Sequence, residues 1–453
     1  MKFIESIKNV WKIEELRNRI IVTLSLLLVY RFGAQVVLPG IDAAQLSGLA
    51  DKTDSGLLGL LNAFTGGAFA NASVFALGIM PYISASIVVQ LMGIAIPYLQ
   101  KLQKEGASGQ KKITQITRWL TIAICLVQAP GYLASLPALG IPTSAFLLGT
   151  GPLFYFSSVT ILVTGCIFAM WLGEKITDKG IGNGISLLIM VGIIATLPQA
   201  FLQNAATRLE GGGNGGLMMV LIEFVIWFVI ILASIMLVMG VRKIAVQYAR
   251  RTASGGYEKS AAAGSRQYIP LKLNASGVMP IIFAQAIMFV PGLIGSSSFL
   301  KDTATGTWMQ TNFSDIFGLV YNITFALLII VFTYFYTAIT VPTNKMADDL
   351  KRSGGFIPGI RPGSETSEYL DKIMSQITLP GSIFLALIAI FPAIIVKLMG
   401  VQQGWAMFFG GTSLLIMVGV AIDTVQQINS YLLNRHYDGL MKTGKNRKSS
   451  SLK

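Results

Sequence analysis

The sequence predicts an all-α, polytopic membrane protein with ten transmembrane helices and one additional half-helix. The chain of 453 residues is 53% apolar and only 12% charged, and its mean hydropathy is +0.64. Ten apolar segments are long enough to cross a bilayer, which takes roughly 20 residues of helix. One apolar run is also too long for a single span and is broken in its middle by glycine and polar residues. Together these observations define the fold class.

The spans follow a charged N-terminal arm, residues 1–19, which carries no signal-peptide pattern. Apolar residues at helical spacing in this arm, including Val10 and Trp11, predict an amphipathic helix on the cytoplasmic interface. The tail, 433–453, is polar and basic and is predicted to be disordered. The ten spans cover about residues 20–38, 74–96, 117–136, 153–172, 183–200, 217–239, 274–294, 317–341, 377–396 and 407–432.

The interrupted run extends from Gly56 to Leu91. Gly66-Gly67 and Asn71-Ala72-Ser73 break it in the middle. Its first half, Leu57–Phe69, is too short to cross a bilayer, whereas the part from Val74 is long enough. We therefore expect a half-helix that enters the membrane from the outside, a glycine-rich tether able to adopt several conformations, and then a full span. Broken backbone at membrane depth is tolerated only where protein buries it or where it lines a water-filled cavity, so the run predicts a cavity or a pore.

The basic residues predict the orientation. With the N-terminus in the cytoplasm, 30 of the 35 Lys and Arg residues fall on the cytoplasmic side and Arg31 lies within span one. The two long basic segments, 240–273 and 342–376, then face the cytoplasm, and the segment 201–216 is an external loop. This asymmetry predicts that both termini are cytoplasmic. The four basic residues on the opposite side are Lys52, Arg208, Lys301 and Lys397.

Two spans repeat a local pattern. Span two begins with Asn71-Ala72-Ser73 and continues to Gly78-Ile79-Met80-Pro81, and span seven begins with the corresponding run 274–280, Asn-Ala-Ser-Gly-Val-Met-Pro. These spans cross the membrane in opposite directions, which is the pattern of an inverted repeat with its functional site between the halves. Alternatively, the match reflects only the frequency of Gly and Pro in membrane helices.

Several kinds of site are excluded or disfavoured. His436 is the only histidine, so a histidine-based metal site or catalytic triad is excluded, and no cofactor is predicted. Cys125 and Cys166 both fall in apolar spans and are interpreted as small buried hydrophobic residues. The segment 439–445 resembles a phosphate loop, but Asn446 replaces the required Ser or Thr.

A secondary transporter with inverted repeats is the alternative function. Such a protein needs polar or charged groups near the membrane midplane. The intramembrane charges are only Arg31, Glu223 and Asp423, and they suggest no ion relay. Isoleucines instead share helix faces in spans two and five, where the simplest interpretation is packing or lipid contact.

Four longer motifs carry more specific information. They are 75–86 (FALGIMPYISAS), 171–186 (WLGEKITDKGIGNGIS), 356–363 (FIPGIRPG) and 410–416 (GGTSLLI). With them the chain resembles the SecY family of bacterial protein-translocation channel subunits, from the N-terminal arm to the last span.

The resemblance implies two pseudo-symmetric, inverted five-helix halves, residues 20–200 and 217–432, hinged through the external loop 201–216. It also implies a lateral gate between spans two and three and spans seven and eight. The half-helix corresponds to the family's plug, with Leu57, Leu58, Leu60, Leu61, Phe64 and Phe69.

A ring of apolar side chains at the pore waist is also implied. Such a ring offers an ion no replacement for its hydration shell and binds no particular side chain tightly, so it suits a pore that must pass any polypeptide. A lateral exit would let an apolar segment of about 20 residues enter the lipid. The ring residues would be Ile79, Ile83, Ile185, Ile189, Ile282 and Ile416.

The resemblance further implies a non-enzymatic channel in the bacterial cytoplasmic (inner) membrane, without cofactors. Its partners would be the SecE and SecG subunits, the SecA motor ATPase, the ribosome, signal peptides, nascent membrane proteins and membrane lipids. Arg361 corresponds to the family's loop arginine for motor and ribosome function. The basic segments offer a docking surface for acidic partners or ribosomal RNA, with Arg242, Lys243, Arg250 and Arg251 as candidates, although basic loops also simply set topology.

Overall fold

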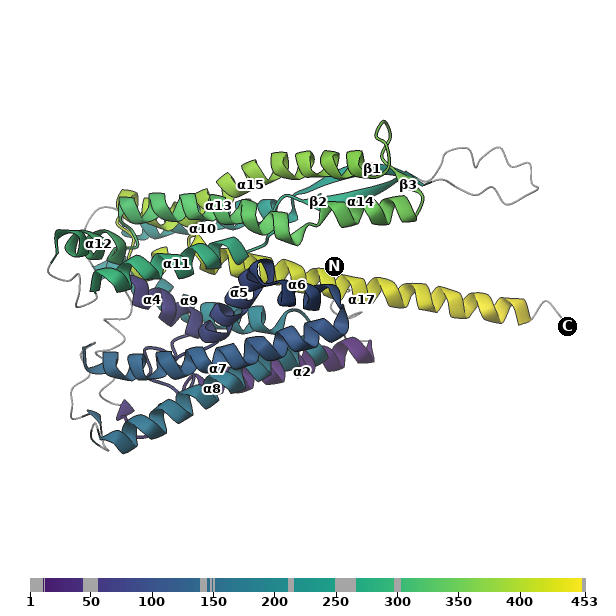
Figure 1. The fold of residues 1–453 in the computed structure, drawn as a ribbon. Coiled ribbons are helices and arrows are strands. Elements are labelled where there is room, and N and C mark those ends of the chain that lie inside the picture. The colour runs from purple at the N-terminus through teal and green to yellow at the C-terminus, as the bar shows by residue number, and fades with distance from the viewer. Residues whose placement is uncertain are drawn as a thin grey trace. The chain divides into compact units, whose positions relative to one another are not determined.

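The structure is a computed structural model that describes residues 11, 13–43, 56–138, 145–146, 149, 151–210, 216–248, 266–296 and 303–449. It is mostly helical (Figure 1), and each of the ten predicted windows overlaps one long helix. The helices are α2 (Glu14–Gly33), α4 (Gly56–Thr65), α5 (Met80–Ala95), α6 (Pro97–Lys104), α7 (Ala107–Ala138), α8 (Pro152–Lys179), α9 (Gly184–Glu210), α10 (Gly216–Met239), α11 (Met279–Ser296), α12 (Ala304–Ser314), α13 (Leu319–Thr340), α14 (Thr343–Arg352), α15 (Ser364–Met399), α16 (Gln403–Ala406) and α17 (Gly411–Ser449).

The helical membrane fold is confirmed. Within the described residues, seven helical segments are long and apolar enough to cross a bilayer. The pair α5 and α6, bent by 102°, brings the number to eight if it is one broken span. The two remaining predicted windows are spans one and seven. Span one corresponds to α2. Span seven corresponds to α11, whose described apolar part is shorter than the seven segments above.

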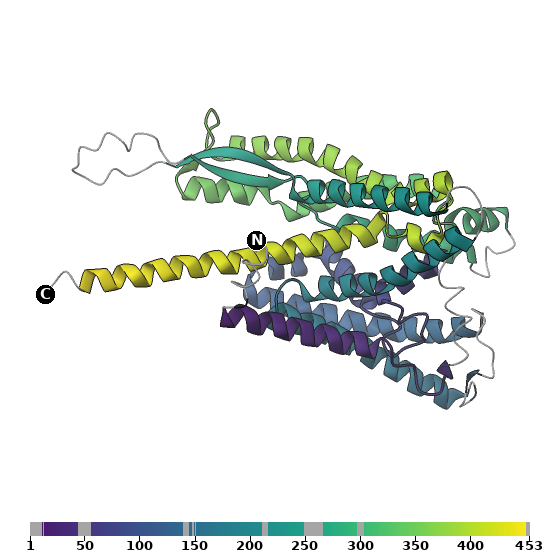
Figure 2. The same cartoon turned by 180° about the vertical axis from the view of Figure 1, so that it is seen from behind.

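The chain divides into two compact units. The first contains residues 1–212, 402–407 and 420–453, and the second contains residues 213–401 and 408–419. In the first unit α8 packs against α2, α7 and α9, and Figures 1 and 2 show α2, α7 and α8 side by side. In the second unit α13 packs against α11 and α15. Each unit therefore has its own apolar core.

A small sheet in the second unit was not part of the all-α prediction. Strands β1 (Val241–Tyr248), β2 (Arg266–Lys272) and β3 (Gly355–Phe356) pair in the order β2-β1-β3, and both pairings are antiparallel. Ile244 faces Ile269 in the register and is buried, whereas Arg242 and Lys243 are exposed. This segment, predicted only as a basic loop, is a hairpin that Figure 2 shows continuing from α10.

Several predicted boundaries were wrong. Glu14–Arg19, assigned to the arm, are the first turns of α2, and most of the remaining arm lies outside the described residues. Helix α9 extends to Glu210, so most of the predicted external loop 201–216 is helical. Helix α17 continues to Ser449, so the tail predicted as disordered is helical up to that residue. In each case the apolar window marks only the membrane part of a helix, and adding polar residues to an existing helix needs no new nucleus.

Span two begins later than predicted. Residues Val74–Ile79 form turns, and α5 begins at Met80. The repeated pattern of span seven behaves in the same way, because α11 begins at Met279. Gly78 and Gly277 precede these starts and have φ of +54° and +63°, a backbone region that favours glycine. The two spans thus share a local structure as well as a sequence pattern.

Candidate functional site

The half-helix α4 ends in a defined capping motif. Gly66 has φ of +67°, its N–H donates to Ala63 O (3.2 Å), and the N–H of Gly67 donates to Asn62 O (2.9 Å). This is the pattern of a Schellman C-cap, in which glycine adopts the left-handed conformation that stops a helix. The break in the apolar run therefore ends α4 at Thr65, inside the predicted plug Leu57–Phe69.

The turn after α4 is fixed and buried. Asn62 Oδ1 accepts a hydrogen bond from the N–H of Ala70 (3.0 Å), and Thr65 Oγ1 accepts one from the N–H of Phe69 (3.1 Å). The hydroxyl of Tyr132 on α7 donates to Phe69 O (2.9 Å), and the two rings pack edge to face with centroids 4.9 Å apart. The predicted glycine tether is thus a hydrogen-bonded turn in this structure, and its ability to adopt other conformations stays a prediction.

The predicted plug residues fall into two groups. Phe64 on α4 is only 8% exposed, and Leu61 is half-buried. Phe69 belongs to the core of the first unit, together with Tyr132 and Cys125. The side chains of Leu57, Leu58 and Leu60 lie outside the described part of the structure. The segment predicted as one plug thus has two structural parts: the short helix α4, and Phe69, which is buried in the core of the unit.

Four of the six predicted ring isoleucines lie in the first unit. Ile79 precedes α5 and is buried, and Ile83 one turn later is half-buried. Ile189 on α9 is also buried. Ile185 packs against α8, because a Cβ added to Gly173 would lie 2.8 Å from Ile185 Cγ1.

The other two ring residues lie in the second unit. Ile282, on α11, is half-buried, and Ile416, on α17, is buried at 4% exposure. The ring stays a prediction, and its six residues come from both units.

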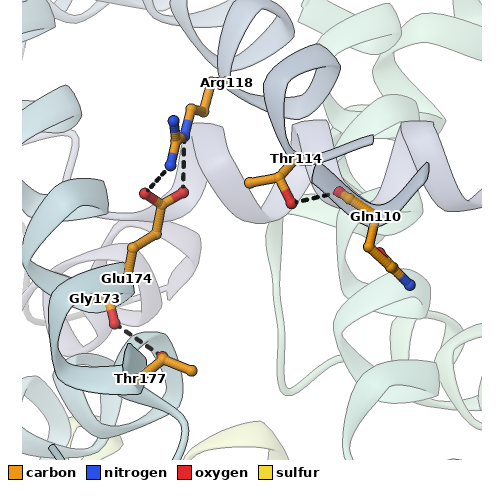
Figure 3. Close-up of polar contacts among 6 residues, drawn as sticks. All are labelled: Gln110, Thr114, Arg118, Gly173, Glu174 and Thr177. Carbon is orange, nitrogen blue, oxygen red and sulfur yellow. Dashed lines mark hydrogen bonds and ion pairs between the residues drawn. The ribbon is translucent and has the colours of Figure 1, made fainter. Parts of the chain in front are cut away.

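An ion pair joins α7 to the C-terminal part of α8 (Figure 3). Arg118 Nε donates to Glu174 Oε1 (3.0 Å), and Arg118 Nη2 donates to Glu174 Oε2. Close by, Thr177 Oγ1 donates to Gly173 O (2.9 Å) and accepts from the N–H of Gly184 (2.9 Å), the first residue of α9. The predicted turn before span five is thus held to α8 by a threonine.

We expect the Arg118–Glu174 pair to contribute at most about 1 kcal/mol, because both side chains are partly exposed. Arg118→Gln and Glu174→Gln should each lower the melting temperature in detergent slightly. The double variant should cost less than the sum of the two, since the pair is lost only once. Lys112→Gln is the control, because Lys112 and Glu105 are more exposed and 3.9 Å apart. Strictly additive losses would contradict the coupling.

Arg361 lies at the tip of the loop between β3 and α15. Its side chain is 87% exposed, and its nearest ion-pair partner among the described residues is Glu365, 3.8 Å away. The loop itself is fixed by backbone contacts: Thr366 Oγ1 donates to Arg361 O (2.8 Å), and the N–H of Ile360 donates to Ile357 O (3.1 Å). The structure therefore presents an exposed charge on a loop held by hydrogen bonds.

The other predicted docking residues lie on or beside the hairpin. Arg242 and Lys243 are exposed on β1, whose end pairs with β3 just before the Arg361 loop. Arg250 and Arg251 lie outside the described residues. A common core supports this sheet, α14 and α15, and it consists of Ile244, Val246, Leu271, Leu350, Ile357, Leu370, Ile373, Met374 and Ile377.

The two cysteines behave as predicted. Cys125 and Cys166 are free thiols, and both are buried in the core of the first unit. Among the residues that the structure describes, no group of three or more His, Cys, Asp or Glu side chains is placed to hold a metal ion.

A comparison with protein families decides the assignment. The family model described as SecY matches residues 73–425. The chain belongs to the SecY family. Similar curated proteins bear the name protein translocase subunit SecY. The SecY of Streptomyces scabiei is 40% identical over 95% of this chain and 98% of its own length. The SecY of Haemophilus influenzae is 40% identical over 94% of each.

Solved structures share the SecY fold. A protein-conducting channel aligns with a TM-score of 0.57 and 16% identity, covering 91% of this chain and 92% of the other. A SecY structure, described as having a plug domain that stabilises the closed channel and maintains a membrane seal, aligns with a TM-score of 0.60 and 18% identity over the same shares. The canine Sec61 channel in a ribosome complex aligns with a TM-score of 0.52 and 16% identity, also over the same shares. At these identities the likeness concerns the fold.

Proposed function

We propose that this chain is the central, pore-forming subunit of a Sec protein translocase. It conducts unfolded polypeptides across the bacterial cytoplasmic membrane and releases transmembrane segments sideways into the lipid. The observation that carries this proposal is the similarity, at about 40% identity over nearly the whole chain, to proteins named translocase subunit SecY. The broken apolar segment supports it, because α4 is a ten-residue helix too short to cross a bilayer.

The seal of this pore combines α4 with the isoleucine ring. Apolar side chains at a narrow waist keep ions in water while they allow an extended chain to pass. At rest α4 blocks the external side of the waist, and an entering polypeptide displaces it. The lateral gate opens between spans two and three and spans seven and eight. Its opening lets an apolar segment partition into lipid, where the segment is more stable.

The partners follow from the chain's charge and from the family. Both termini face the cytoplasm, as the basic residues predict. On that side the hairpin and the Arg361 loop dock the SecA motor or the ribosome. The Sec61 and Ssh1 channels, which share the fold, are described in complexes with ribosomes. SecE and SecG complete the membrane complex. ATP hydrolysis belongs to the motor, and this chain is a channel rather than an enzyme.

Reconstitution tests the proposal directly. The chain, with its SecE and SecG partners, is placed in proteoliposomes with SecA, ATP and a precursor that carries a signal sequence. We expect the precursor to become protected from protease only when ATP is present. A precursor without its signal sequence is the control. Protection of neither precursor, or of both equally, would contradict a signal-dependent channel.

We expect the double substitution Ile83→Ser and Ile185→Ser to make the resting channel leak ions. Two hydroxyls in an apolar constriction favour water there, and water carries ions. Single-channel recording in planar bilayers measures the effect. Ile287→Ser is the control, because Ile287 is 41% exposed and lies on α11 outside the predicted ring. Conductance of the double variant equal to that of the wild type would count strongly against the ring.

A further inference from the structure

The C-terminal end of α4 is held by a charged side chain from α2. Arg31, in the last turn of α2, donates a hydrogen bond from Nη1 to Gly66 O. Gly66 is the capping residue of α4, and the C-terminus of a helix carries a partial negative charge that favours a cation. A hydrogen bond from a charged donor is also stronger than one between neutral groups. Arg31, an intramembrane charge with no part in an ion relay, thus has a specific partner.

The backbone of helix α9 packs directly against the C-terminal end of α4 at Gly192. A Cβ added to Gly192 on α9 would lie 2.8 Å from Phe64 O and 3.2 Å from Gly66 N. A Cβ added to Gly66 would lie 2.8 Å from Gly192 Cα and 3.3 Å from Arg31 Nη1. Contacts this short with backbone atoms are not relieved by side-chain rotation. Any side chain at Gly192 would therefore push the end of α4 away from α9.

We propose that Arg31 and Gly192 form a latch that seats α4 in the resting channel, and that the strength of this latch sets how often α4 leaves its seat. This inference rests on the proposed sealing role of α4. Arg31 contributes an attraction, and Gly192 contributes the space in which the attraction acts. Both are positioning residues, because they act on the seal only through α4. Gly192 is three positions after Ile189, so the seat of α4 lies on the same helix as two predicted ring residues.

The accessibility of a cysteine in α4 tests the latch. Ala63 on α4 is 8% exposed, so Ala63→Cys should react slowly with a membrane-impermeant maleimide in the reconstituted complex. In that background Arg31→Gln should raise the labelling rate at least about tenfold, the factor that corresponds to a lost hydrogen bond with a charged donor. Gly192→Val should also raise it, because the added side chain pushes the end of α4 away from α9. The buried native thiols Cys125 and Cys166 should stay unlabelled, and they report whether the unit is still folded.

Two matched controls accompany these variants. Arg17→Gln removes a charge from the same helix, α2, and should leave labelling unchanged. Gly131→Val adds the same side chain to α7 at a position where a Cβ would meet nothing within 4 Å. Unchanged labelling of Ala63→Cys in both latch variants would overturn the proposal. Equal labelling of Cys125 and Cys166 would also overturn it, because the junction would then support the whole unit.

Resting conductance, recorded on the same variants, separates the latch from the seal. Faster labelling with a larger resting current supports both the latch and the sealing role of α4. Faster labelling with an unchanged current supports the latch but removes the sealing role from α4, so the two ideas fail separately.

Discussion

Arg361→Glu should abolish motor-driven translocation while the protein remains folded and inserted. The guanidinium is exposed and takes no part in the backbone contacts that fix its loop. Reversal of its charge therefore leaves the support intact. It places a carboxylate against an acidic partner surface, where like charges cost roughly several kcal/mol, or more than about a hundredfold in affinity. Protease protection of a precursor in proteoliposomes with SecA and ATP measures the loss.

The control for Arg361→Glu is Arg352→Glu. Arg352 is an exposed arginine at the end of α14 in the same unit. The segment 342–376 contains five basic and five acidic residues, and each reversal changes its formal charge by the same amount, from zero to −2. We expect Arg352→Glu to transport nearly as well as the wild type. Normal transport by Arg361→Glu, or an equal loss in both variants, would remove Arg361 from a specific docking role.

Deletion of Leu57–Thr65 should raise the resting ion conductance strongly and preserve translocation. These residues make up almost all of α4, the helix proposed to close the pore. The turn that follows loses its hydrogen bonds to Asn62 and Thr65 but keeps Tyr132, which packs on Phe69 and donates to its carbonyl. The variant should also tolerate defective signal sequences, since an entering chain no longer has to displace α4. Planar-bilayer recording and precursor transport measure the two effects.

Phe69→Ala tests the anchoring contact between Phe69 and Tyr132 separately from the sealing helix α4. This substitution leaves α4 in place and removes a buried ring from the core, at a cost of ~3–5 kcal/mol. We expect a lower melting temperature with a resting conductance close to that of the wild type. If the Leu57–Thr65 deletion instead abolishes folding and leaves the conductance of surviving channels unchanged, α4 is a structural strut.

Hydropathy was sufficient to locate the membrane helices, because the bilayer itself sets both their length and their composition. It could not locate their ends. Residues 201–210 are too polar to count as a span, yet they continue α9. The hairpin was missed although its signal was present. In Val241–Tyr248 the buried Ile244 and Val246 alternate with less buried residues, but the basic charge of the segment is equally typical of a loop that sets topology.

The candidate site was predictable only in part. The glycines at 66–67 marked the end of α4, because a left-handed residue stops a helix in any context. Gly192 carried no local signal. Its importance depends on Phe64 and Gly66, more than a hundred positions earlier in the chain, and only tertiary packing brings these backbones together. Tyr132 was not predicted for the same reason, because its hydroxyl donates to the carbonyl of Phe69, 63 residues earlier in the chain.

The hairpin has a mechanical consequence. Only Gly240 separates α10 from β1, and the N–H of Leu273, just after β2, donates to Gly240 O (2.8 Å). A short turn then leads from β2 into α11. Helices α10 and α11 are therefore both connected by short segments to the base of one hydrogen-bonded hairpin. A partner that bound and tilted this hairpin would therefore exert a torque on α10 and α11, so mechanical work done outside the membrane would reach the bilayer without a separate moving part.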